Sequence, residues 1–99
     1  MRLTANQVDA IRAAADEVFG PGVEVWLFGS RTDDHRRGGD IDLLIRPAGA
    51  PPKASVVEKL RFLGLLERRI GERKVDVVIE TRDDPRPIVR VAHDTGIRL

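Results

Sequence analysis

Residues 23–45 read VEVWLFGSRTDDHRRGGDIDLLI, and the expected architecture of the chain follows from this stretch. Its first six residues are rich in β-branched and aromatic side chains, which is typical of a strand that ends at Gly29. Residues 30–39 are all polar or glycine and indicate a loop or a short helical turn. Residues 40–45 alternate at first and then become apolar, as in a strand with one solvated end. We therefore predict two strands joined by a short polar connection.

Amphipathic helices are predicted on both sides of this strand pair. Thr4 and Gln7 form a capping box, and apolar side chains then recur at helical spacing until Gly20. Ser55 and Glu58 form a second capping box at the start of a second helix. The apolar stripes that these helices should bury consist of Val8, Ile11, Ala15 and Val18 in the first helix and Val57, Leu60, Leu63, Leu66 and Ile70 in the second.

A third strand and a third helix follow. Residues 75–79, VDVVI, are predicted to be a strand, and Asp84 and Pro85 to be the N-cap and first residue of a helix that reaches about Thr95. The short loop between the first two strands favours antiparallel pairing, whereas the helical connection to the third favours a parallel, right-handed crossover. The prediction is an α/β (α+β) fold in the order α-β-β-α-β-α, with helices flanking a small three-stranded mixed sheet.

Length and hydropathy restrict the class of protein. The 99 residues predict a single domain, residues 1–99, because chains usually devote about 100 to 200 residues to each domain. No apolar run reaches about 18 residues and the first residues lack a signal-peptide pattern, so we expect a cytoplasmic protein that does not enter a membrane. A core this small would gain stability from a partner or from homo- or hetero-oligomer formation.

Charge and residue types restrict the chemistry. With 17 basic and 16 acidic residues the formal charge is +1, and we expect no direct nucleic-acid partner. The chain has no Cys, which excludes disulfides and thiolate zinc sites, and its two His cannot build a His-rich metal cage. One of them, His93, is expected on the surface of the last helix. Metal chemistry with oxygen ligands remains open.

Three polar features are predicted to meet at one edge of the sheet. Gly29 and Ser30 leave the first strand, Asp40 and Asp42 open the second on one face, and Asp76 lies one residue inside the third. Crowded carboxylates raise one another's pKa unless a cation balances them, and Mg²⁺ is the simplest balance. Two such ions can clamp the attacking and leaving oxygens of an in-line displacement, while a glycine lets backbone N–H groups approach phosphate. The pattern therefore indicates phosphoryl or nucleotidyl transfer.

The motifs LFGSR, GGDIDLLI and KVDVVIE together resemble the minimal nucleotidyltransferases of the DNA polymerase beta superfamily, of the antitoxin type. The resemblance covers roughly residues 23–80. It implies a nucleotidyltransferase fold in which Gly29 and Ser30 hold a nucleoside triphosphate. Arg31 lies where members of the family often carry a basic residue near the phosphates.

The same resemblance implies the metal site and the catalytic residues. Asp40 and Asp42 would bind two Mg²⁺ ions, and Asp76 would be the third carboxylate, which helps to activate the attacking hydroxyl. ATP would be the donor substrate. None of the three carboxylates is replaced in this sequence.

The resemblance also implies a partner. Stand-alone members are often antitoxins paired with HEPN-domain toxins, which are ribonucleases, and some move AMP from ATP onto a toxin tyrosine. The expected function is therefore Mg²⁺-dependent transfer of a nucleoside monophosphate onto a protein acceptor. One alternative is a binding module that neutralises its partner by occlusion, with a vestigial nucleotide site. Another is a metal-dependent nuclease, which gives no reason for Gly29 and Ser30.

Overall fold

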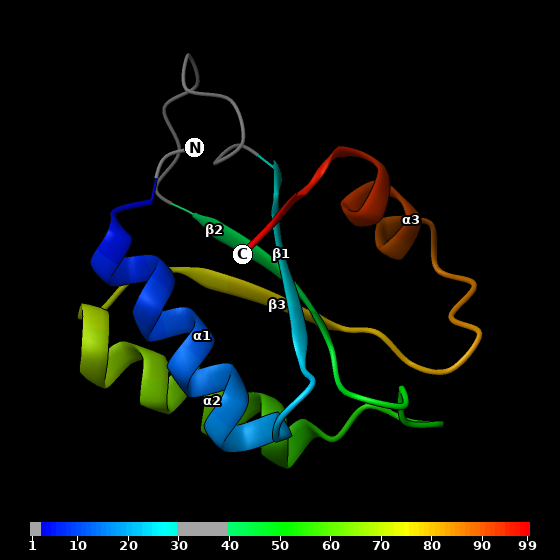
Figure 1. Cartoon of the computed structure of the whole chain (residues 1–99), viewed down its shortest axis with the longest axis horizontal. Coiled ribbons are helices and arrows are strands. Elements are labelled where there is room, and N and C mark those ends of the chain that lie inside the picture. Colours follow the sequence, from blue (N-terminus) through cyan, green and yellow to red (C-terminus); the bar gives the residue numbers. More distant parts are fainter. Residues whose placement is uncertain (1–2, 30–39) are drawn as a thin grey trace.

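The computed structural model describes residues 3–29 and 40–99 as a mixed α+β fold. The elements are α1 (Ala5–Phe19), β1 (Glu24–Phe28), β2 (Ile41–Arg46), α2 (Val56–Ile70), β3 (Val75–Ile79), α3 (Pro87–Thr95) and β4 (Ile97–Arg98). Their arrangement is drawn in Figure 1. The predicted fold class and the order α-β-β-α-β-α are confirmed, and β4 is added at the end. No helix in the described ranges has the length and apolar character needed to cross a bilayer.

The four strands form one mixed sheet in the order β3-β2-β1-β4. β1 and β2 are antiparallel and β2 and β3 are parallel, as predicted from the lengths of their connections. β4 pairs antiparallel with β1 through Trp26 with Arg98 and Leu27 with Ile97. Two residues are too few to show an alternating pattern, so the sequence carries no signal for β4.

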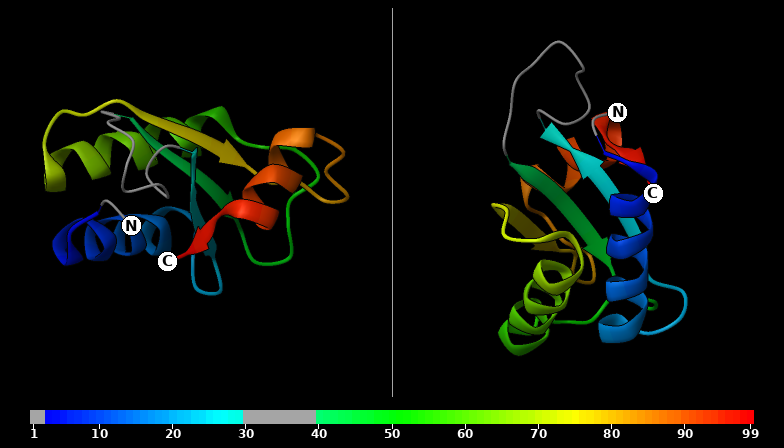
Figure 2. Two further views of the ribbon diagram at one scale, coloured as in Figure 1. Left: turned by 90° about the horizontal axis from the view of Figure 1, so that it is seen from above. Right: turned by 90° about the vertical axis from the view of Figure 1, so that its left-hand side faces the viewer.

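The helices cover the two faces of the sheet unequally. α1 and α2 lie side by side (Figure 2) and bury the larger core against one face. α3 packs on the opposite face against a smaller cluster around Leu44 and Phe28. The largest fully buried side chains are Phe62, Ile11, Leu27, Ile41, Leu43, Leu44, Ile45 and Leu66. The middle strands therefore carry apolar side chains on both faces.

α1 forms as the sequence predicts. The Thr4 hydroxyl accepts a hydrogen bond from the backbone N–H of Gln7 at 3.1 Å, and the Gln7 side chain accepts one from the Thr4 N–H at 2.9 Å. This reciprocal capping box satisfies two N–H groups that the helix leaves unpaired. Ile11, Ala15 and Val18 are buried, as expected, and Val8 is half-buried.

The predicted apolar stripe of α2 is partly wrong. Ser55 caps the helix by accepting from the Glu58 N–H at 3.2 Å, but Val57 and Leu60 are 75% and 62% exposed. Phe62 is fully buried instead, and its ring lies 6.0 Å from that of Phe19 in α1. An aromatic ring removes more apolar surface from water than Val or Leu, so packing of Phe62 against α1 decides which side of α2 faces the core.

The predicted start of the last helix is also wrong. α3 begins at Pro87 with Arg86 as its N-cap, two residues after the predicted cap. The Asp84 carboxylate instead accepts hydrogen bonds from the backbone N–H groups of Thr81 and Arg86, both at 3.1 Å. Arg86 also donates from Nη2 to the carbonyl of Ile79 at 2.7 Å. Asp84 therefore fixes the loop between β3 and α3, because its side chain satisfies loop donors on both sides.

His93 ties α3 to the sheet, contrary to the expected place on the helix surface. Its Nε2 lies 2.5 Å from Oε1 of Glu80, at the end of β3, and its ring meets that of Trp26 edge-on with centroids 4.4 Å apart. Glu80 is also 3.6 Å from Nε of Arg46. Since the His93 side chain is only 31% exposed, it belongs to the contact between α3 and the sheet.

Candidate active site

The register of β2 and β3 brings two of the predicted carboxylates together. Asp42 in β2 lies directly opposite Asp76 in β3 across the parallel ladder. Neighbouring strands are about 4.8 Å apart, so side chains at one register position on one face are in contact range. The charge of Asp76 and a side-chain interaction with it are among the causes that raise the pKa of Asp42, as expected for two neighbouring carboxyl groups.

The surroundings of Asp42 disfavour its ionised form. Partial burial is the largest cause that raises the pKa of the Asp42 carboxyl, followed by the negative charges of Asp76 and Asp40. The positive charge of Lys74 acts in the opposite direction. Among the residues that the structure describes, Asp42 therefore stands in a cluster of negative charge that Lys74 only partly neutralises.

Gly29 closes this site from the side of β1. Phe28 pairs with Asp42, and the next residue, Gly29, lies directly beside the Asp42 carboxylate. A Cβ at Gly29 would lie 3.1 Å from Cγ of Asp42 and still closer to Oδ2, and the backbone φ is +77°. Both the close approach and the left-handed conformation require glycine. The sequence assigned this glycine to a close approach between the backbone and phosphate, which stays a prediction, and the structure adds a close approach to Asp42.

Asp40 lies at the mouth of the site. It directly precedes β2, and its Oδ2 is 3.6 Å from Nζ of Lys74, which directly precedes β3. Both side chains are well exposed, at 46% for Asp40 and 70% for Lys74. Such an exposed ion pair is weak and can exchange for a bound ligand at little cost.

Sequence reasoning missed Lys74. A signal was present: the parallel pairing of Ile41 with Val75 also brings the residues just before them, Asp40 and Lys74, close together. The hydrogen bond from the Ile41 N–H to the Lys74 carbonyl, 3.0 Å long, extends the ladder to this point. Once the crossover between the strands was expected to be parallel, Lys74 could have been placed beside the carboxylates.

The structure thus sets Asp42 opposite Asp76 and beside Gly29, with Asp40 near enough for its charge to act on Asp42. The predicted phosphate-binding residues Ser30 and Arg31 lie outside the described residues. Within 3–29 and 40–99, no group of three or more His, Cys, Asp or Glu side chains is arranged so that it could hold a metal ion. The metal-binding and catalytic roles of the three aspartates remain predictions. The carboxylate oxygens of these residues are donors of the kind that a hard divalent cation prefers.

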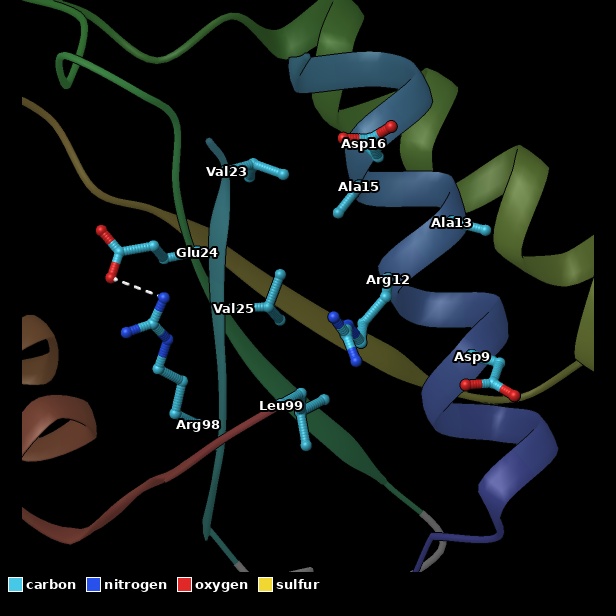
Figure 3. A pocket seen from close by; sticks show the side chains of 10 residues that line it. All are labelled: Asp9, Arg12, Ala13, Ala15, Asp16, Val23, Glu24, Val25, Arg98 and Leu99. Atoms are coloured by element: carbon cyan, nitrogen blue, oxygen red, sulfur yellow. Dashed lines mark ion pairs between the residues drawn. The ribbon is translucent and has the colours of Figure 1, made fainter. Parts of the chain in front are cut away.

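A separate pocket of about 380 Å³ lies between α1, β1 and β4 (Figure 3). An ion pair between Arg98 and Glu24, 3.3 Å long, borders it. Its other lining residues are Asp9, Arg12, Ala13, Ala15, Asp16, Val23, Val25 and Leu99. These residues include the start of β1, whereas Gly29 follows its end, so this pocket is distinct from the carboxylate site.

Carboxylates at the starts of two parallel strands, beside a glycine turn, define an acidic site suited to cation-assisted chemistry on phosphate esters. The comparison with protein families identifies the class: residues 8–98 match the family model described as nucleotidyltransferase domain. The chain therefore belongs to the nucleotidyltransferase domain family, and nucleotidyl transfer is its class of reaction. No curated protein and no solved structure matched the chain significantly.

Proposed function

We propose that this chain is a Mg²⁺-dependent nucleotidyltransferase that moves AMP from ATP onto a protein acceptor. The acceptor would be a HEPN-domain toxin, and the chain would act as its antitoxin. The observation that carries the transferase assignment is the register of Asp42 with Asp76 beside Gly29. The acceptor and the antitoxin role rest on the sequence resemblance alone.

The position of each residue in the site suggests its role. The Gly29 turn, continued by Ser30, would offer backbone N–H groups and a hydroxyl to the triphosphate. Asp40 and Asp42 would hold Mg²⁺, with Asp76 as the third carboxylate. The bound cation would supply charge neutralisation for the phosphates and for the leaving pyrophosphate. Asp76 would help to activate the acceptor hydroxyl, whose oxygen bonds to the α-phosphorus as the bond to pyrophosphate breaks.

Lys74 would respond to the charge of the bound substrate. In the free protein it lies beside Asp40. When Mg²⁺ neutralises the carboxylates, this ion pair loses most of its attraction. The ammonium group would then be available to a phosphate oxygen. We therefore assign Lys74 a role in substrate binding.

The direct test is incubation of the chain with ATP labelled at the α-phosphate, Mg²⁺ and a HEPN-domain partner. We expect label on the partner with the unchanged chain and none with Asp42→Asn. Asp9→Asn, an exposed aspartate in α1, is the matched control and should label normally. Equal labelling by Asp42→Asn would show that the assigned site is wrong.

A second readout separates binding from chemistry. Titration of the chain with ATP, with and without Mg²⁺, should show binding that depends on the cation and is lost in Asp42→Asn. A variant with all three aspartates replaced by Asn should fail to suppress the toxin in cells. If it still suppresses the toxin, neutralisation occurs by occlusion and the nucleotide site is vestigial.

A further inference from the structure

The N-terminal half of α2 carries an exposed apolar stripe. Val56, Val57 and Leu60 are 70%, 75% and 62% exposed, which makes them the most exposed large apolar side chains of the described residues. Gly64 follows Leu60 by one turn on the same side of the helix and is also exposed. We call these four residues the α2 stripe. Scattered apolar side chains are normal on a surface, but a continuous stripe marks a site of interaction.

The α2 stripe contains both a projection and a depression. Leu60 projects into solvent, whereas Gly64 has no side chain, and a Cβ built there would meet no heavy atom within 4 Å. A helix surface with a large side chain and a glycine one turn apart is complementary in shape to the same surface of an antiparallel copy. The leucine of each helix then enters the space above the glycine of the other, as knobs enter holes in packed helices.

The charged side chains along one edge of the stripe are also complementary to those of an antiparallel copy. Lys59, Leu63 and Glu67 follow one another at intervals of four residues and therefore share this edge. Lys59 and Glu67 are about 12 Å apart along the axis, at about 1.5 Å per residue, so they cannot pair within one helix. Neither side chain forms an ion pair within the part of the chain that the structure describes.

We propose that the α2 stripe binds a second copy of this chain, with the two α2 helices antiparallel. Residue 62 is the midpoint of Leu60 and Gly64, and residue 63 is the midpoint of Lys59 and Glu67. A single two-fold axis near these positions therefore places each leucine over a glycine and each lysine beside a glutamate. Parallel helices related by a two-fold axis would instead put the two copies of this edge on opposite sides of the pair, so Lys59 and Glu67 could not meet.

The expected dimer is weak. One pair of four-turn helices buries less surface than a standard interface, so we expect dissociation in the micromolar to millimolar range. Sedimentation velocity of the full chain across this range should show conversion of monomer to dimer. Leu60→Glu should weaken the dimer at least about tenfold, because it places a charge at the centre of the interface. Val91→Glu, at a similarly exposed apolar position in α3, should leave it unchanged.

A charge exchange tests the geometry itself. Lys59→Glu and Glu67→Lys should each weaken the dimer, and the double variant should restore it, since the pair is re-formed with reversed signs. Lys59→Glu puts an acid nearer the start of α2 and Glu67→Lys puts a base nearer its end. Both changes therefore stabilise the helix through its dipole, and loss of folding would not explain a weakened dimer. Circular dichroism verifies the folded state.

Gly64→Gln is a further variant that fills the depression without disturbing the monomer. It should weaken the dimer while the helix is retained, because Gln is the better helix former. A chain that stays monomeric throughout the concentration range would overturn the proposal. A dimer that survives Leu60→Glu and Gly64→Gln, or that the double charge variant fails to restore, would show that the copies associate elsewhere.

Discussion

Gly29 and Gly49 show how one residue type meets different demands in this protein. Their φ angles are nearly equal, at +77° and +76°. A Cβ at Gly29 would collide with the Asp42 carboxylate, whereas a Cβ at Gly49 would meet no atom within 4 Å. The backbone conformation requires glycine at both positions, and the carboxylate adds a second requirement at Gly29 alone. The pair therefore separates backbone strain from a contact at the site.

Gly29→Ala and Gly49→Ala use this contrast as a prediction. Each should lower the free energy of unfolding by about 1–2 kcal/mol, because a Cβ disfavours the left-handed conformation. Gly29→Ala should also reduce ATP affinity at least about tenfold, since Asp42 must move to make room. Urea unfolding and ATP titration measure the two effects. Equal ATP binding by both variants would contradict the assigned role of Gly29.

Asp76→Asn tests the electrostatics of the carboxylate cluster. The pKa of Asp42 is raised in the folded protein, so folding favours the protonated carboxyl. This contribution to stability is present at low pH and is lost as the pH rises through the raised pKa. Removal of the Asp76 charge should raise the free energy of unfolding at pH 7, without divalent cations, by about 0.3–1 kcal/mol. The gain should fade as the pH falls through the raised pKa of Asp42, which lies above the ordinary Asp value of about 3.9.

The controls for this prediction use a distant carboxylate and the cation. Asp9→Asn, in α1, should show no such gain at either pH. Added Mg²⁺ should stabilise the unchanged chain more than the Asp76→Asn variant, because the cation relieves the repulsion that the variant already lacks. The idea fails if Asp76→Asn is less stable than the unchanged chain in urea with a chelator present.

At the scale of the element, the loop between β3 and α3 depends on Asp84. Its side chain is only 2% exposed, and hydrogen bonds from the Arg86 side chain, then from the Thr81 and Arg86 N–H groups, hold the pKa of Asp84 well below its usual range. The Arg86 side chain donates to Asp84 at 2.6 Å through Nη2 and at 2.9 Å through Nε. The ionised carboxylate is therefore part of the folded loop.

Asp84→Asn should lower the free energy of unfolding at pH 7 by about 1–3 kcal/mol, because the hydrogen bonds to a charged acceptor are lost. A lowered pKa gives stability above the unfolded value of about 3.9 that disappears as the pH falls toward the folded value. The difference between the two proteins should therefore shrink below about pH 4. Asp83→Asn, exposed at φ +53°, is the control and should have little effect. Urea unfolding at pH 7 and pH 3 distinguishes these outcomes.

The helices and strands differ in how well the sequence predicts them. α1 follows from local rules, because Thr4, Gln7 and the buried stripe all agree with the structure. In α2 the caps are local but the buried side depends on Phe62 meeting Phe19 of α1, which no window of α2 contains. The start of α3 was misplaced because Asp84 finds its donors in the loop around Thr81 rather than in the helix. Local patterns thus miss a buried side that a tertiary contact sets, as in α2, and a cap residue whose side chain finds other donors nearby, as in α3.

At the scale of the molecule, the candidate site was predictable because it depends on register. Strand alternation and connection lengths placed Asp42 and Asp76 at the same edge, and the sheet sets them opposite each other. Lys74 was missed because its place beside Asp40 follows only from the exact register of β2 with β3. The tie between His93 and Glu80 joins residues 13 apart, and no periodicity predicts it.

The two apolar clusters predict unequal stability across the molecule. Of the residues that the structure describes, the cluster beneath α1 and α2 contains 14 buried ones, whereas the cluster beneath α3 contains four: Phe28, Leu44, Val89 and Ala92. Local opening requires less free energy where fewer apolar contacts are lost. We therefore expect amide hydrogens of α3 to exchange well before those of α1 and β2.

His93→Ala tests which contacts hold α3 in place. The variant loses both the hydrogen bond to Glu80 and the ring contact with Trp26. Exchange in α3 should become about tenfold faster, which corresponds to about 1.4 kcal/mol, while exchange in α1 and β2 changes little. Arg90→Ala, at an 86% exposed side chain of the same helix, is the control and should preserve the protection of α3. Hydrogen exchange measured by mass spectrometry decides the matter: uniform acceleration in all helices would mean that α3 unfolds only together with the whole molecule.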